Sequence, residues 1–251
     1  MNRLKTIIYF TLFFAIVSCQ SDDTAESIDV GNTVKLSDMI VNRTIETGAV
    51  ISCAASDATN TDVVNVYYYL EEGATNVRFF ETNTTNVDKD DYTTYNELII
   101  NSTTLFDGFI YQFSRTFAQE QWVIIAFELD GEAKLSNPIR TKNITKPTVW
   151  TDEVVINQET SKMPKFTWEH NANGDNAIYF QVVSTVDNGL LSGTYTYENE
   201  FQYYDTSNVV LNISEENPSG LTIDSSYKFT LMDVSEDNWV NTVIQDIFVA
   251  Q

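Results

Sequence analysis

Short apolar runs recur along the chain from residue 34 onward, and clusters of Asn, Asp, Gly, Ser and Thr separate them. Runs of this length with alternating apolar and polar positions, bounded by turn-forming residues, are typical of β-strands. No long segment shows the 3.6-residue apolar period of an amphipathic helix, and helix-forming residues are sparse. The pattern therefore predicts an all-β chain.

The first half of the chain contains a series of candidate strands. The series ends at residues 142–147 (KNITKP), where we expect a domain boundary. The predicted strands are 49–54, 63–70, 77–82, 97–102, 110–117, 122–129 and 136–141. The Asp130-Gly131 turn and the segment 135–141 after it resemble the F–G hairpin and last strand of a fibronectin type III or related immunoglobulin-like sandwich. Pro147 resembles the opening of a second such module, so we expect domains at 34–145 and 146–251.

The second half repeats the strand pattern more clearly. Alternation around Phe166 and Trp168 predicts that both side chains enter a core. A strand at 178–186 places Ile178, Phe180 and Val182 on one face. Further strands are expected at 194–198, 209–213, 227–231 and 239–249.

A Leu-x5-Tyr spacing from Leu221 to Tyr227 resembles the tyrosine corner of fibronectin type III domains, in which the phenol bonds a backbone group upstream. The sequence departs from that motif at Ile223, where a proline is usual. The fold that we predict is two tandem immunoglobulin-like (fibronectin type III-like) β-sandwiches. A single larger jelly roll that uses both halves is the alternative.

The N-terminus has the organisation of a secretory signal. Arg3 and Lys5 precede the apolar run 7–17, which is too short to span a bilayer. The run ends in Ile16-Val17-Ser18-Cys19, which resembles the bacterial lipobox and would make residues 1–18 a lipoprotein signal peptide. The resemblance implies that Cys19 is lipidated and becomes the new N-terminus, followed by an acidic tether at 19–33. A secretory signal with a chance cysteine, or a membrane anchor, is the alternative.

The residues after Cys19 indicate a location. Gln20-Ser21-Asp22-Asp23 resembles the acidic export signal of Bacteroidetes lipoproteins that are displayed on the outer face of the outer membrane. The resemblance implies a membrane partner through acyl chains on Cys19, which hold a protein far better than one chain does. An acidic solvated tether without such a signal is the alternative.

Charge excludes one class of partner. The chain has 36 Asp and Glu against 14 Lys and Arg, a formal net charge of −22, which becomes −24 when cleavage removes Arg3 and Lys5. Such a chain repels nucleic acid and anionic headgroups, so we expect no nucleic-acid partner. With Cys19 lipidated, Cys53 has no disulfide partner, and its strand-like surroundings predict a buried small side chain.

Catalytic motifs are absent from the sequence. It has no Gly-rich phosphate loop, no G-x-S-x-G and no H-E-x-x-H, and its single histidine is His170 in a polar loop. We therefore predict no enzyme activity. A carboxylate pair for glycoside hydrolysis stays open, because only spatial separation decides it.

Two kinds of binding residue stand out. Acidic loops can hold Ca²⁺ through several oxygen ligands, although neither cluster matches an EF-hand and solvated turns look the same. The clusters are Asp88, Asp90 and Asp91, and Asp233, Glu236 and Asp237. Aromatic rings beside turns can stack on sugars, although core packing is the commoner role of such rings. The candidate ligand-binding rings are Trp150, Tyr203, Tyr204 and Trp239.

These observations favour a non-enzymatic cell-surface lipoprotein that binds or scaffolds a polysaccharide or an outer-membrane protein through loops or an exposed sheet face. The first alternative is a glycan-binding accessory lipoprotein that resembles the SusE/SusF type of Bacteroidetes polysaccharide-uptake systems. A glycoside hydrolase-type enzyme is the second alternative. A glycan binder needs coplanar exposed aromatics, a scaffold needs an apolar patch or a free sheet edge, and a hydrolase needs two converging carboxylates.

Overall fold

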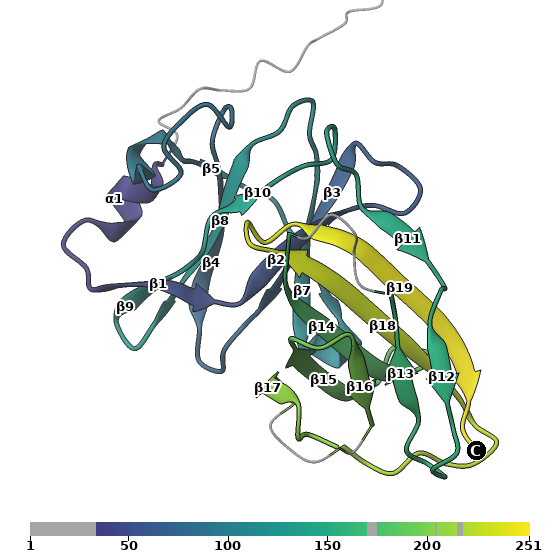
Figure 1. Ribbon diagram of the computed structural model, residues 1–251. Helices are drawn as coiled ribbons and strands as arrows, with labels where there is room; N and C mark the ends of the chain where they lie inside the picture. The colour runs from purple at the N-terminus through teal and green to yellow at the C-terminus, as the bar shows by residue number, and fades with distance from the viewer. Residues whose placement is uncertain (1–33, 170–174, 204, 215–217) are drawn as a thin grey trace, which may run out of the picture. The chain divides into compact units, whose positions relative to one another are not determined.

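The computed structural model describes residues 34–169, 175–203, 205–214 and 218–251 (Figure 1). The lipobox, the tether, His170 and Tyr204 lie outside the described residues. Residues Thr33–Gln251 form one compact unit. Within the described part, no helix has both the length and the apolar character needed to cross a bilayer.

The first half of the described chain forms a β-sandwich of two sheets. Sheet 1 has the order β1-β9-β8-β4-β5, with β10 also paired to β8, and sheet 2 has the order β2-β3-β7-β6. The strands are β1 (Ile45–Val50), β2 (Ser52–Ser56), β3 (Val63–Tyr69), β4 (Thr75–Glu81), β5 (Asn96–Leu98), β6 (Ser102–Leu105), β7 (Ile110–Thr116), β8 (Trp122–Leu129), β9 (Glu132–Ser136) and β10 (Ile139–Arg140). Three short helices accompany them: α1 (Leu36–Ile40), η1 (Tyr92–Thr94) and η2 (Phe106–Gly108).

The second half forms another sandwich. Sheet 3 has the order β11-β19-β18-β14-β15-β17, and sheet 4 has the order β12-β13-β16. The strands are β11 (Val149–Thr151), β12 (Val155–Asn157), β13 (Lys165–Thr167), β14 (Asn176–Thr185), β15 (Leu190–Thr196), β16 (Glu200–Gln202), β17 (Val209–Asn212), β18 (Ser226–Ser235) and β19 (Val240–Val249).

Both sandwiches follow one plan, which confirms the predicted pair of immunoglobulin-like sandwiches. In each, the entering strand pairs in parallel with the second strand of a hairpin near the end of the sandwich, β1 with β9 of the β8–β9 hairpin and β11 with β19 of the β18–β19 hairpin. The next strand then pairs antiparallel in the opposite sheet, β2 with β3 and β12 with β13. The tyrosine corner is also present, because the Thr222 N–H donates to the Tyr227 hydroxyl at 2.8 Å, beside a buried Leu221.

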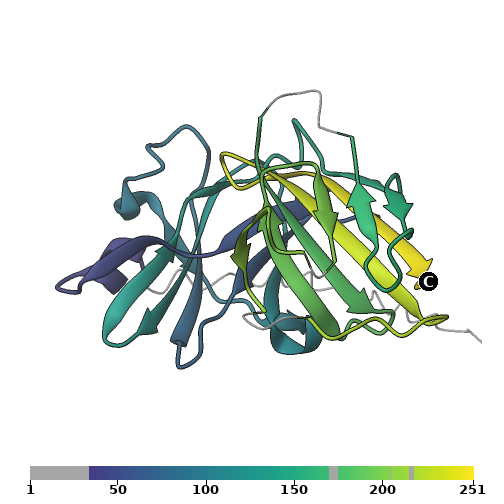
Figure 2. The ribbon, with the colours of Figure 1, turned by 60° about the horizontal axis from the view of Figure 1, so that its bottom comes forward.

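The four sheets stack as successive layers in the order 1-2-3-4 (Figures 1 and 2). Side chains between each pair of neighbouring sheets form an apolar cluster. Cys53 and Tyr67 from sheet 2 pack with Val182, Met232 and Val243 from sheet 3, so the two sandwiches share a buried layer. The outer face of sheet 1 is covered in turn by α1, which packs with that face in a fourth cluster. Sheets 1, 2 and 3 therefore each have buried apolar residues on both faces.

Burial of sheet 3 on both faces explains why β14 has a continuous run of buried residues instead of an alternation of buried and exposed ones. Tyr179 and Val183 face the core of the second sandwich, whereas Phe180 and Val182 face the first sandwich. The prediction that Ile178, Phe180 and Val182 share a face is confirmed, and that face is the one between the sandwiches. Phe166 and Trp168 lie in the core as predicted, with 0% and 4% exposure.

Three predicted strands are each divided in two. The segment 49–54 is interrupted at Ile51, where the chain crosses from sheet 1 to sheet 2, and the segment 97–102 divides between β5 and β6 for the same reason. The segment 136–141 is interrupted at Asn137-Pro138, because proline has no N–H to donate to the ladder. The prediction missed the short helices α1, η1 and η2, the short strands β11, β12 and β16, and all of β9 except Ser136.

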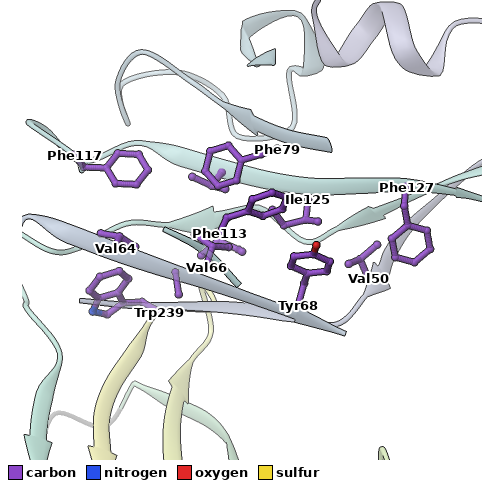
Figure 3. Packing of buried hydrophobic residues seen from close by; sticks show 13 residues of the cluster. Val50, Val64, Val66, Tyr68, Phe79, Phe113, Phe117, Ile125, Phe127 and Trp239 are labelled. Atoms are coloured by element: carbon purple, nitrogen blue, oxygen red, sulfur yellow. The ribbon is translucent and has the colours of Figure 1, made fainter. Parts of the chain in front are cut away.

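Trp239, in the turn between β18 and β19, joins the two sandwiches. Its side chain is fully buried among core residues of the first sandwich, beside Val64 and Val66 (Figure 3). The indole Nε1 donates to the Lys146 carbonyl at 2.8 Å, and the Ala54 N–H donates to the Asn238 carbonyl at 3.0 Å. The second sandwich thus supplies a core residue to the first.

We expect Trp239→Ala to lower the free energy of unfolding by about 3–5 kcal/mol, because it leaves a large cavity in the first core and frees the Lys146 carbonyl. Urea unfolding followed by circular dichroism measures this change. Tyr197→Ala is the matched control, since Tyr197 is 63% exposed, and it should change stability by less than ~0.5 kcal/mol. Equal effects of the two substitutions would contradict the anchoring role of Trp239.

Candidate functional site

A groove opens at one end of the second sandwich. Strands β14, β18 and β19 of sheet 3 have ten residues each, whereas the strands of sheet 4 have three each, so sheet 4 leaves part of the facing surface uncovered. The groove has a volume of about 450 Å³. This size falls in the range of small-molecule sites. Its lining is Val149, Trp150, Thr151, Glu153, Trp168, Glu169, Tyr179, Leu231, Asp233, Thr242 and Ile244.

The floor of the groove is a cross-strand row on the inner face of sheet 3. Asp233 on β18 pairs with Tyr179 on β14 and with Thr242 on β19, and Leu231 pairs with Ile244 in the next row. Alternate residues of a strand point to the same face, so Leu231 and Asp233 share the floor. The register of the sheet thus places one carboxylate among apolar and hydroxyl side chains.

Asp233 is buried, with 3% exposure. Asn176 Nδ2 donates to its Oδ1 at 2.5 Å, and within the described residues no cationic side chain forms an ion pair with it. Burial, and secondly the charge of Asp233, raise the pKa of the neighbouring Tyr179 to about 12. The phenol is therefore neutral at physiological pH.

The side of the groove consists of Trp168, which follows β13 directly. Its ring stands edge-on against Tyr179, with ring centroids 5.2 Å apart and planes at 73°. Because Trp168 is 4% exposed, its ring face is not open for stacking. Glu153 and Glu169 are exposed at the rim. Among the described residues, the lining holds three carboxylates and no lysine, arginine or histidine.

The structure places the predicted aromatic residues mostly in the interior. Trp150 is half-buried, its Nε1 donates to the Ser56 carbonyl at 2.9 Å, and its ring packs in the layer between the sandwiches while its strand borders the groove. Tyr203 and Trp239 are fully buried, and the Tyr203 hydroxyl donates to the Ser219 carbonyl. Burial corrects the expectation that these two rings meet a sugar, since neither offers an exposed face. Tyr204 lies outside the described residues.

The acidic loop proposed for calcium is held by its own hydrogen bonds. Asp88 Oδ1 accepts from the Asp90 N–H at 3.0 Å, and Asp90 pairs with Lys89. Asp91 accepts from the side chain and the backbone N–H of Thr93, and these bonds lower the pKa of the Asp91 carboxyl. Among the described residues, no group of three or more acidic, histidine or cysteine side chains is arranged to hold a metal ion.

The second acidic cluster is divided by the fold. Asp237 pairs with Lys142 at 2.8 Å, whereas Asp233 turns into the groove. Sequence reasoning named Asp233 only as a loop ligand and missed Glu153, Trp168, Glu169 and Tyr179 as neighbours. One signal was present, because a carboxylate at an inward position interrupts the otherwise buried apolar run of β18.

Comparisons with known proteins give no family. No protein-family model matches the chain, and no curated protein matches it. A two-domain fibronectin type III segment of chicken tenascin is 12% identical, with 80% of this chain and 95% of that chain covered and a TM-score of 0.26. The chicken interferon gamma receptor alpha chain is 11% identical, with 80% and 96% covered and a TM-score of 0.23. TM-scores this low carry no argument, so the fold assignment rests on the strand order described above.

The predicted burial of Cys53 is confirmed, and burial raises the pKa of its thiol to about 12. An unfolded cysteine has a pKa of about 8.5, so the native thiol should not react with Ellman's reagent at pH 8 while the urea-unfolded thiol should. Residues 21–251, which contain no other cysteine, are the protein to use. The raised pKa also predicts that stability falls as the pH rises above ~8.5, because only the unfolded thiol then ionises. Rapid native labelling would contradict a closed layer between the sandwiches.

Proposed function

We propose that this chain is a non-enzymatic binding or scaffolding module, lipid-anchored through Cys19 and displayed on the outer membrane of a Bacteroidetes-type cell. The observation that carries the binding role is the open groove at the end of a sandwich that the shared layer holds in a fixed position. A groove of this kind on a rigid scaffold suits recognition of a partner.

The position where the tether joins supports this role. Leu36 and Met39 of α1 are buried against the outer face of sheet 1, so the chain enters the folded body at the first sandwich. The groove lies between sheets 3 and 4 of the second sandwich. A chain anchored before residue 34 therefore carries its groove on the sandwich to which the tether is not attached.

The described residues favour a protein or small-molecule ligand over a polysaccharide. A glycan platform needs several exposed rings on one face, whereas the exposed aromatic side chains in the described part are Phe109 at 40% and Tyr197 at 63%, on different sandwiches. A hydrolase needs a pair of carboxylates that flank the scissile bond, whereas the groove has one carboxylate in its floor, Asp233, and two at its exposed rim, Glu153 and Glu169.

Lipid anchoring predicts that Cys19→Ala abolishes incorporation of labelled palmitate and releases the protein from the membrane fraction, because the acylated sulfur is lost. Cys53→Ala is the matched control and should keep both the label and the membrane fraction. Protease treatment of intact cells then tests display, since a surface protein is degraded without lysis. Palmitate label that survives in Cys19→Ala would refute the anchor.

Affinity electrophoresis tests the class of ligand. We expect residues 21–251 to migrate without retardation through gels that contain neutral or charged polysaccharides, with and without calcium, and to release no reducing sugar. Cross-linking on intact cells should instead give a discrete protein adduct. Retardation by one polysaccharide would favour the SusE/SusF-like alternative, and release of sugar would favour a hydrolase.

A further inference from the structure

Asp233 combines near-complete burial with the lack of an ion-pair partner among the described residues. It is the one carboxylate among the described residues that the fold buries almost completely. Two acids that are less buried do have cations, since Asp175 pairs with Lys146 at 2.7 Å and Glu81 pairs with Arg115 at 3.1 Å. Asp233 has only the Asn176 amide among the described residues. A buried carboxylate without a counter-charge is costly, and an external cation would remove that cost.

The other residues that line the groove also favour a cation as the ligand. Glu153 and Glu169 add negative charge at the rim, and the described residues of the lining include no basic side chain. Electrostatic attraction would concentrate cations there and repel anions. Val149, which is 58% exposed and pairs with Thr242 next to Asp233, provides an apolar surface that fits a short alkyl stem. A bare metal ion is disfavoured, because the described residues contain no group of three ligands arranged for one.

We propose that this groove binds the ammonium group of a primary alkylamine, with Asp233 as the buried counter-charge and Val149 against the alkyl stem. The proposal rests on the proposed function, because it names the ligand class of the same groove. The ammonium can belong to a free amine or to a lysine side chain of a protein partner, and both carry the same charged end on an alkyl stem.

The test is isothermal titration calorimetry of residues 21–251, which keep the whole compact unit Thr33–Gln251. The probes are 1,5-diaminopentane, for a free amine, and N-acetyl-lysine methylamide, for a lysine side chain. We expect saturable binding of at least one probe at one site, with quenching or a shift of tryptophan fluorescence from Trp168. The probe that binds more tightly identifies the source. Absence of saturable binding by both would overturn the proposal.

Asp233→Asn should weaken binding at least tenfold, since it keeps the shape of the side chain and removes the charge. Asp246→Asn is the matched control, because it removes the same charge from a neighbouring strand outside the groove lining, and it should change the affinity less than twofold. Equal weakening by the two variants would show diffuse attraction to an acidic protein and would overturn the proposal.

A second measurement does not depend on any variant folding. Pentan-1-ol has the alkyl stem without the charge and should not compete with the amine for the groove. Competition by pentan-1-ol at the concentration of the amine would show an apolar site and overturn the ammonium assignment. The palmitate, protease and cross-linking experiments do not involve Asp233. Failure of amine binding alone would therefore leave the proposed surface-binding role standing.

Discussion

The insertion of Trp239 into the core of the first sandwich is the contact on which the arrangement of the two sandwiches depends. A residue from the last hairpin of the chain fills a space between sheets that form much earlier in the sequence. Around it, the Thr148 hydroxyl donates to the Val240 carbonyl at 2.8 Å and accepts from the Ser56 N–H at 2.9 Å. These bonds satisfy buried polar groups at the junction and fix the direction in which the second sandwich leaves the first.

The shared layer changes what the second sandwich can offer to a ligand. In an isolated sandwich the outer face of sheet 3 would be free, whereas here Phe180, Val182 and Met232 on that face are buried against sheet 2. Sheet 3 can therefore contact a ligand only through the open part of its inner face, at the end of the sandwich. The short strands of sheet 4 supply that opening, since they leave Tyr179 and Asp233 without a covering strand.

Local sequence patterns were enough to predict the fold, whereas the junction between the sandwiches and the composition of the groove depend on tertiary contacts. Alternation around Phe166 and the Leu221-to-Tyr227 spacing act within one sandwich, so they were readable from the sequence. Trp239 could not be placed, because its neighbours come from the other half of the chain. The break at Ile51 was hidden, since apolar residues continue through the point where the strand changes sheet. The partners of Asp233 depend on a strand register that the sequence does not encode locally.

The packing of α1 on the outer face of sheet 1 places the entry of the chain and the groove at a fixed distance from each other. Neighbouring sheets pack roughly 10 Å apart. Two such spacings, with sheet 2 between them, separate sheet 1 from sheet 3, so the groove lies on the order of 20 Å or more from the face where the chain enters. Because the layers are packed without a flexible linker between them, this stand-off is a fixed length. A body built in this way would hold its recognition surface clear of whatever its N-terminus is fastened to, much as a rigid stalk would.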